Sequence, residues 1–148
     1  MAKIRLTKEF SFEAAHALYN YDGKCSRLHG HSYKFFVTIK GSPIEDENNP
    51  KLGMVMDFGM LKQIVNQQII NLYDHSVMFY KKSEESALKD SSAIFKNTHV
   101  FDFQPTCENL IIYFAEKLKN QLPKNVKLHS LKLYETATSF AEWYDEDN

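Results

Sequence analysis

Hydrophobic and polar residues alternate along three stretches of the chain, which is the pattern of strands with one buried face. In residues 3–14 the large apolar side chains recur at even positions, and His16 continues that parity. In residues 32–40 they recur at odd positions, and residues 126–136 form the third such stretch. Residues 139–144 are a shorter fourth candidate. The pattern therefore predicts four strands, two near each end of the chain.

Two further stretches repeat their apolar residues every three to four positions, as amphipathic helices do. Asp57 can cap the first helix, which we expect to end near Tyr73. Its apolar positions are Leu61, Ile64, Val65, Ile69 and Leu72. Thr106 can cap the second helix, and Pro123 ends it. The apolar positions there are Leu110, Ile111, Phe114 and Leu118.

The segments between these elements are short or polar. Residues 41–53 form a polar loop with two prolines and two glycines, and residues 81–99 read as a surface excursion. A short apolar run at residues 76–80 and a brief alternation at residues 100–106 precede the second helix. This order of elements predicts an α+β fold, with an antiparallel sheet and helices on one side. Without repeats or an interior linker, we expect one domain over residues 1–148.

Composition narrows the class of protein. The 148 residues are 43% hydrophobic and 25% charged with a net charge of −1, so no overall basic field attracts nucleic acid. No apolar run approaches the roughly 18–20 residues of a membrane span. The segment "MAKIRLTKEF" lacks the apolar core of a secretory signal, and two cysteines are too few for a disulfide framework. We therefore expect a cytoplasmic protein with free thiols.

Three histidines share the apolar parities of the first two strands. His29 and His31 are two residues apart, which aims both imidazoles at one face of an extended chain, and His16 ends the preceding strand. Three nitrogen ligands with an open fourth position form the usual catalytic zinc site. The alternative is that the three histidines are unrelated and each is satisfied by its own hydrogen bonds.

Cys25 lies six residues before His31 and admits three interpretations. It can be a fourth ligand that closes a structural zinc site, or a thiolate beside the metal that acts as a base or nucleophile. It can also be an inert buried thiol, although its polar neighbours, including Lys24 and Arg27, argue against deep burial. Spacing alone leaves these alternatives open.

Several other side chains could take part in chemistry. Asp74 and His75 lie at a boundary between elements, where a carboxylate can orient an imidazole if the chain turns. Glu135 continues an apolar parity, so it lies either beyond the sheet edge or buried with a partner such as a ligand with an N–C–NH₂ edge. Glu108 falls in the first turn of the second helix, where the helix dipole favours it, and Cys107 is most simply a packing residue.

Taken together, these motifs resemble the 6-pyruvoyl tetrahydropterin synthase family. The matching segments are "FSFEAAHAL", "CSRLHGHSY", "MDFGMLK", "LYDHSV", "QPTCENL" and "LYETATSFAEW", which occur in the family's order from residue 10 to about residue 144. No single segment is specific for this family, but their combination is. The three-residue gap between Cys25 and His29 resembles the branch that makes 6-carboxytetrahydropterin for queuosine (7-deazaguanine) biosynthesis, because the animal pyruvoyl enzymes have a longer gap. A third branch has glutamate in place of this cysteine.

The resemblance implies a role for each of these residues. Zinc would be the cofactor, bound by His16, His29 and His31. Cys25 would accept the proton, with His75 as its relay partner and Asp74 supporting His75, and Glu135 would anchor the pterin and join the charge relay. Thr106 and Glu108 would lie near the pterin pocket.

The resemblance also implies the fold and the reaction. The fold would be the tunnelling fold (T-fold), whose subunit sheets join into a barrel, commonly as trimers stacked into hexamers, with active sites between subunits. The expected activity is that of a carbon–carbon lyase that converts 7,8-dihydroneopterin triphosphate into 6-carboxytetrahydropterin, acetaldehyde and triphosphate. The alternatives are the pyruvoyl activity, which stops after triphosphate elimination, and a non-catalytic zinc-stabilised interaction module.

Overall fold

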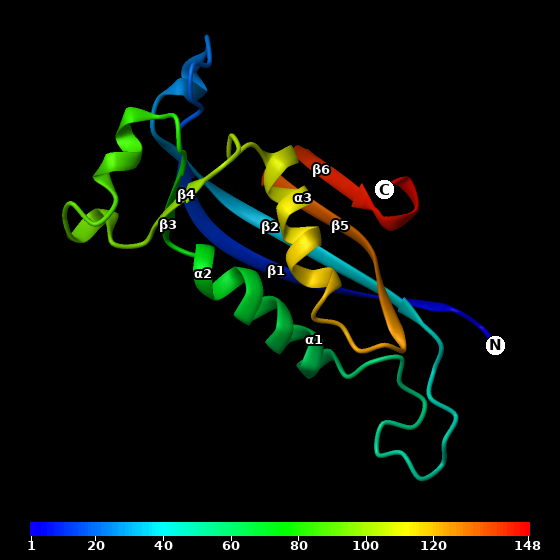
Figure 1. Cartoon of the computed structure of the whole chain (residues 1–148). Coiled ribbons are helices and arrows are strands. Elements are labelled where there is room, and N and C mark those ends of the chain that lie inside the picture. The colour runs from blue at the N-terminus through cyan, green and yellow to red at the C-terminus, as the bar shows by residue number, and fades with distance from the viewer.

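A single six-stranded sheet organises the computed structural model, with the strand order β4-β3-β1-β2-β5-β6 (Figure 1). The strands are β1 (Ile4–His16), β2 (His29–Gly41), β3 (Ser76–Tyr80), β4 (Thr98–Phe101), β5 (Val126–Thr136) and β6 (Ser139–Tyr144). The four strands expected from alternation are all present. The first two are longer than expected, so all three histidines lie within strands.

The sheet is antiparallel in its four long strands and parallel at one edge. β1 pairs with β2, β2 with β5 and β5 with β6, all antiparallel. β3 adds to the C-terminal end of β1 in parallel, and β4 adds to β3 in parallel. The expected antiparallel sheet is thus confirmed for the long strands, and two short parallel strands extend it. The brief alternation expected at residues 100–106 forms β4 at Thr98–Phe101 instead.

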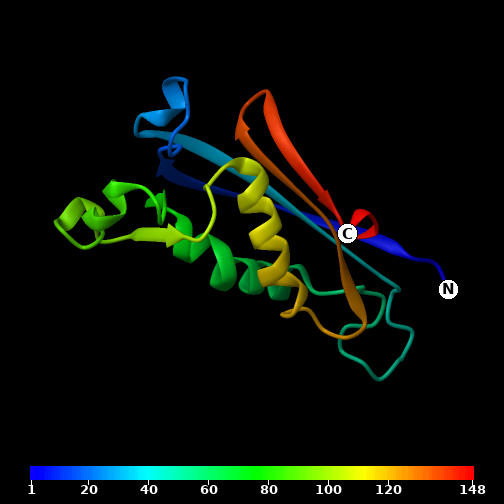
Figure 2. The same ribbon diagram turned by 45° about the horizontal axis from the view of Figure 1, so that its top comes forward.

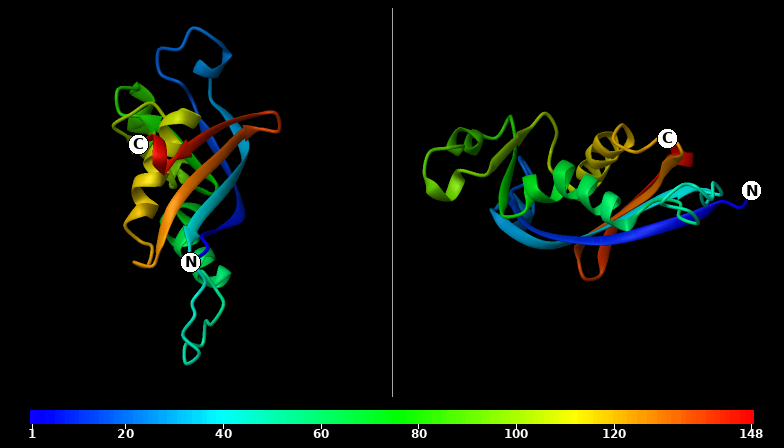
Figure 3. Two further views of the ribbon diagram at one scale, coloured as in Figure 1. Left: turned by 90° about the vertical axis from the view of Figure 1, so that its right-hand side faces the viewer. Right: turned by 90° about the horizontal axis from the view of Figure 1, so that it is seen from below.

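Two helical segments cover one face of the sheet (Figure 3). The first contains α1 (Phe58–Val65), a π-helical stretch (Asn66–Ile70) and α2 (Asn71–Tyr73), and the second is α3 (Cys107–Lys119). Both predicted caps are present, because the Asp57 side chain accepts a hydrogen bond from the Gly59 amide and the Thr106 side chain accepts one from the Asn109 amide. None of the helices is long and apolar enough to cross a membrane.

The core lies between this face of the sheet and the helices, and it contains 26 buried residues in one cluster. The Phe12 ring of β1 stacks on the Tyr33 ring of β2, with centroids 4.8 Å apart. The Phe114 ring of α3 meets Phe12 edge-on at 6.1 Å. His16 lies on the same face of β1 as Phe12, and His29 and His31 lie on the same face of β2 as Tyr33. The three histidines therefore continue the core at one end of the β1–β2 hairpin.

Two irregular segments gather at that end of the hairpin (Figure 2). One is the connection of residues 17–28, with a 3₁₀ turn at Lys24–Ser26. The other is the mostly exposed segment before β4, which contains short 3₁₀ helices at Glu84–Leu88 and Ala93–Phe95. Its exposed character agrees with the expected surface excursion.

Candidate functional site

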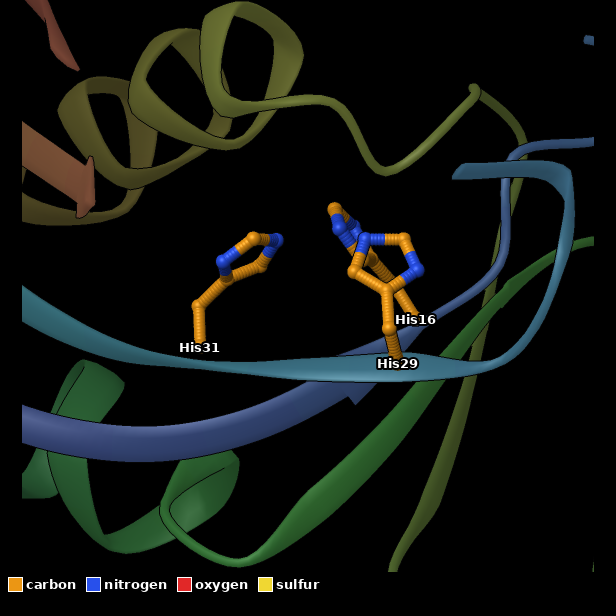
Figure 4. Close-up of side chains that lie close together, drawn as sticks. All are labelled: His16, His29 and His31. Carbon is orange, nitrogen blue, oxygen red and sulfur yellow. The ribbon is translucent and has the colours of Figure 1, made fainter. Parts of the chain in front are cut away.

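The pairing register of β1 and β2 brings the three histidines together. His16 lies opposite His29 across the hairpin, and His31 follows two residues along the same face of β2. The ring centroid of His16 is 4.7 Å from that of His29 and 5.1 Å from that of His31. Figure 4 shows the three side chains rising from the sheet toward one another.

Backbone carbonyl groups fix the orientation of two of the rings. His16 Nδ1 lies 2.7 Å from the carbonyl oxygen of Pro105, and His29 Nδ1 lies 2.7 Å from that of Arg27. Since a carbonyl oxygen only accepts, each Nδ1 carries the hydrogen and each Nε2 presents a lone pair. The Nε2 atoms of His16, His29 and His31 are all buried without a hydrogen-bond partner.

These three imidazoles fit a metal ion. Each offers one nitrogen, and the three nitrogens lie within 4.8 Å of one another. Buried polar atoms without partners are costly, and a bound cation would satisfy all three. Burial lowers the pKa of His16 to about 4, although its hydrogen bond to Pro105 opposes the shift, and burial also lowers the pKa of His31. At neutral pH His16 is therefore in the neutral form that binds metals.

A cavity of about 410 Å³ opens over His16. Its wall includes Cys25, Thr106, Glu108 and Glu135, which come from the 17–28 connection, the start of α3 and the end of β5. Cys25 is partly exposed, and it is not among the residues whose ligand atoms cluster. The structure thus places the thiol on the wall of the cavity and outside the group of three histidines.

A pair of hydrogen bonds ties the 17–28 connection to the segment just before α3. The Tyr19 amide donates to Gln104 Oε1, and Gln104 Nε2 donates to the Tyr19 carbonyl oxygen, both at 2.8 Å. Asn109 Nδ2 in turn donates to the Gln104 carbonyl oxygen at 3.0 Å. These contacts hold the connection that carries Cys25 against the N-terminal turn of α3.

The carboxylate of Glu135 lies beside one of the three histidines. Its Oε1 lies 3.2 Å from His31 Nε2, and its side chain is 25% exposed. The approach lacks hydrogen-bond geometry, so His31 Nε2 is left without a hydrogen-bond partner. The Tyr33 ring lies next to that of His31, and its hydroxyl is buried without a hydrogen-bond partner. Burial and the negative charge of Glu135 raise the pKa of this hydroxyl. Nothing in the sequence pattern indicated this hydroxyl, because Tyr33 reads as an ordinary core residue.

Asp74 and His75 form a pair, as the sequence suggested, because the chain turns between α2 and β3. Asp74 Oδ1 lies 3.0 Å from His75 Nδ1 and accepts a hydrogen bond from the Glu13 amide at 2.9 Å. The Glu13 amide and His75 both lower the pKa of Asp74, the amide contributing more. His75 is 80% exposed and lines a second, shallower cavity with His31, Ser32 and Ser76. Within one chain, His75 and Cys25 therefore lie on different cavities.

The remaining cysteine is not available for chemistry. Cys107 is buried, and its thiol donates a hydrogen bond to the Leu133 carbonyl oxygen at 3.3 Å. Burial raises the pKa of this thiol to about 12. Cys107 thus packs the base of α3 against β5, as expected.

The sequence as a whole resembles characterised proteins over nearly its full length. Residues 5–146 match the model of the family described as 6-pyruvoyl tetrahydropterin synthase. A 6-carboxy-5,6,7,8-tetrahydropterin synthase of Haemophilus influenzae is 34% identical over 144 residues, which cover 96% of this chain and 99% of the relative. The protein of that name from Synechocystis is 35% identical over 137 residues, covering 93% of this chain and 90% of the relative.

The fold agrees with the sequence comparison. The structure of Caenorhabditis elegans 6-pyruvoyl tetrahydropterin synthase matches with a TM-score of 0.68 and 27% identity, covering 97% of this chain and 96% of that chain. The match confirms the expected tunnelling fold, a curled sheet with helices on one face. The chain belongs to the 6-pyruvoyl tetrahydropterin synthase family.

Proposed function

We propose that this chain is a 6-carboxytetrahydropterin synthase, a carbon–carbon lyase of queuosine biosynthesis. It would convert 7,8-dihydroneopterin triphosphate and water into 6-carboxy-5,6,7,8-tetrahydropterin, acetaldehyde and triphosphate. The observation that carries the proposal is the group of three histidines with free Nε2 atoms beside a cavity that Cys25 and Glu135 line. The two relatives that bear the name of this enzyme support the choice of product.

The three histidines would hold a zinc ion. When bound, such an ion supplies a Lewis acid that stabilises negative charge developing on oxygen atoms of the substrate's side chain. The carbonyl groups of Pro105 and Arg27 keep two of the ligands in the correct tautomer before the metal arrives. A site prepared in this way loses little orientational freedom when it binds.

The cavity wall would bind and orient the pterin. The two oxygens of the Glu135 carboxylate match two parallel N–H donors on the N–C–NH₂ edge of the ring. Thr106 and Glu108 lie on the same wall, at the start of α3. Fixing the ring at Glu135 places the side-chain carbons of the substrate beside the thiol of Cys25, which is catalysis by positioning.

Cys25 would remove the proton from the substrate's side-chain carbon, and His75 would exchange protons as triphosphate leaves. Asp74 keeps the hydrogen on His75 Nδ1, which leaves Nε2 for that transfer. Because His75 and Cys25 lie on different cavities of one chain, the pair would form between two subunits. We therefore also propose a trimer-based homo-oligomer, often a hexamer, in which subunit sheets join into a barrel.

An assay for acetaldehyde tests this function. The purified protein, loaded with one zinc ion per chain, is incubated with 7,8-dihydroneopterin triphosphate under reducing conditions. We expect acetaldehyde and triphosphate in equal amounts, and chelation of the zinc should abolish both. Triphosphate without acetaldehyde would show the pyruvoyl activity instead, and release of neither product would favour a non-catalytic zinc-binding module.

A further inference from the structure

The turn that carries Asp74 and His75 has a strained backbone. His75 has a φ of 58°, a left-handed conformation that is unfavourable for a residue other than glycine. Such a conformation persists only where surrounding contacts hold it. The contacts at this turn therefore determine where the His75 imidazole lies.

One amide side chain, distant along the chain, contacts the turn at three points. Asn97 Nδ2 lies 3.3 Å from the carbonyl oxygen of Leu72, 3.3 Å from that of Asp74 and 3.4 Å from that of His75. A helix leaves its last carbonyl groups without partners, and these contacts supply donors at the end of α2. The backbone carbonyl oxygen of Asn97 also accepts a hydrogen bond from the Val77 amide at 3.0 Å.

A neighbouring histidine fixes the orientation of this amide. His99 Nε2 lies 2.8 Å from the Leu72 carbonyl oxygen and 3.1 Å from Asn97 Oδ1. The carbonyl oxygen only accepts, so His99 Nε2 carries a hydrogen and Asn97 Oδ1 accepts from it. The NH₂ group of Asn97 must then face the three carbonyl oxygens.

Strand β1 holds the turn from the other side. The His75 amide donates to the Glu13 carbonyl oxygen at 2.6 Å, and the Glu13 amide donates to Asp74 Oδ1 at 2.9 Å. We propose that Asn97 is a positioning residue whose amide clamps the Leu72–His75 turn against β1, so that the His75 imidazole stays on the Asp74 carboxylate. This also gives the 81–99 segment a function, since its end delivers Asn97 and His99 to the turn.

The catalytic consequence rests on the proposed role of His75 in proton transfer. If Asn97 acts through His75, Asn97→Ala should lower kcat about tenfold, and KM and zinc content should stay unchanged, because neither the pterin cavity nor the three metal ligands include Asn97. Asn97→Asp keeps the shape of the side chain but removes both N–H donors, so it gives the same test if the alanine variant does not fold. Asn71→Ala is the matched control, since Asn71 is exposed in the same helix end and its side chain makes no hydrogen bond. An Asn97 variant with the kcat of the Asn71 control would overturn the proposal.

A double-mutant cycle separates positioning from a general structural role. In the His75→Ala background, Asn97→Ala should cause no further loss of kcat, because the group that Asn97 positions is already gone. Independent losses that multiply would mean that Asn97 acts elsewhere in the protein, and would contradict the proposal.

Amide hydrogen exchange tests the clamp without any substrate. The His75 amide should exchange about tenfold faster in Asn97→Ala than in the wild-type protein or the Asn71 control, while amides in the centre of β2 remain unchanged. Equal exchange at His75 would refute the clamp. Faster exchange in a protein that does not turn over dihydroneopterin triphosphate would instead support the clamp and refute the proposed function.

Discussion

At the scale of single residues, two backbone carbonyl groups prepare the metal site. The oxygens of Pro105 and Arg27 hold the hydrogens of His16 and His29 on Nδ1, so the Nε2 lone pairs face inward. Cys25 lies nearby on the cavity wall but outside this cluster. Metal binding and thiol chemistry should therefore be separable by substitution.

Replacing Cys25 tests that separation. We expect Cys25→Ala to retain about one zinc ion per chain and the wild-type stability, and to lose at least about a hundredfold in kcat, as for removal of a general base. Metal analysis and steady-state kinetics measure both quantities. Ser26→Ala serves as the control, since Ser26 is exposed in the same turn as Cys25 and does not line the cavity. Loss of zinc and of the fold from Cys25→Ala would show a fourth, structural ligand instead.

The depressed pKa of His16 predicts how the metal-free protein responds to acid. Folding lowers this pKa from 6.5 to about 4, mainly by burial, so between these values the unfolded chain binds more protons than the folded one. The free energy of unfolding should therefore fall as the pH drops from 6.5 toward 4, by up to about 3 kcal/mol from this residue. Urea unfolding of chelated protein across this range measures it.

A variant isolates the contribution of His16 from that of the carboxylates. His16→Gln lacks the titrating group, so its free energy of unfolding should depend less steeply on pH over the same window. Parallel curves for the variant and the wild type would contradict the prediction. Added zinc should move the loss of stability to lower pH, because protons and metal compete for the same nitrogens.

At the scale of elements, most strands and helices could be predicted from the sequence, but the contacts between them could not. Alternation predicted β5 at Val126–Thr136, and the cap at Thr106 predicted the start of α3 at Cys107. The register that sets His16 opposite His29 depends on the length of the hairpin, which parity alone does not define. The β5 register shift opposite Thr38 and Ile39, by contrast, has a local signal. The apolar residues change there from even positions (Val126, Leu128) to odd ones (Leu131, Leu133).

The parallel pairing of β3 and β4 and the Asn97 contacts escaped prediction for a similar reason. β4 pairs with β3 across an exposed segment of polar residues, and only the folded chain brings them together. The amide of Asn97 reaches carbonyl oxygens 22 to 25 residues away along the chain. Backbone acceptors have no sequence signature, so a residue that binds them looks like any surface asparagine.

Thr106 both caps α3 and lines the cavity, so one substitution there should change stability and substrate binding. The Thr106 hydroxyl accepts a hydrogen bond from the Asn109 amide at 3.2 Å, and Thr106 also lines the cavity. Thr106→Ala should lower the free energy of unfolding by about 1 kcal/mol and raise KM for the pterin. Thr106→Ser, which keeps the hydroxyl, should recover most of the stability. Thr138→Ala is the control, because Thr138 is exposed in a turn and caps no helix; an equal loss there would remove the capping explanation.

At the scale of the whole molecule, the proposed proton-transfer groups do not meet within one chain. Cys25 lines the cavity over His16, whereas His75 lines another cavity with His31, Ser32 and Ser76. A second copy of the chain would bring His75 to Cys25, which is the shared site expected of the oligomer. An active site shared in this way predicts complementation between inactive subunits.

Mixing two inactive variants tests this arrangement directly. Cys25→Ala and His75→Ala subunits are unfolded together, refolded at equal concentrations and assayed for acetaldehyde. Each site would combine Cys25 of one subunit with His75 of another. Half of the sites then have the intact thiol, and half of those also have the intact imidazole. About a quarter of wild-type activity should therefore return. Each variant refolded alone should stay inactive. A mixture as inactive as its components would place both groups in one chain, and would require a conformation that closes the two cavities onto each other.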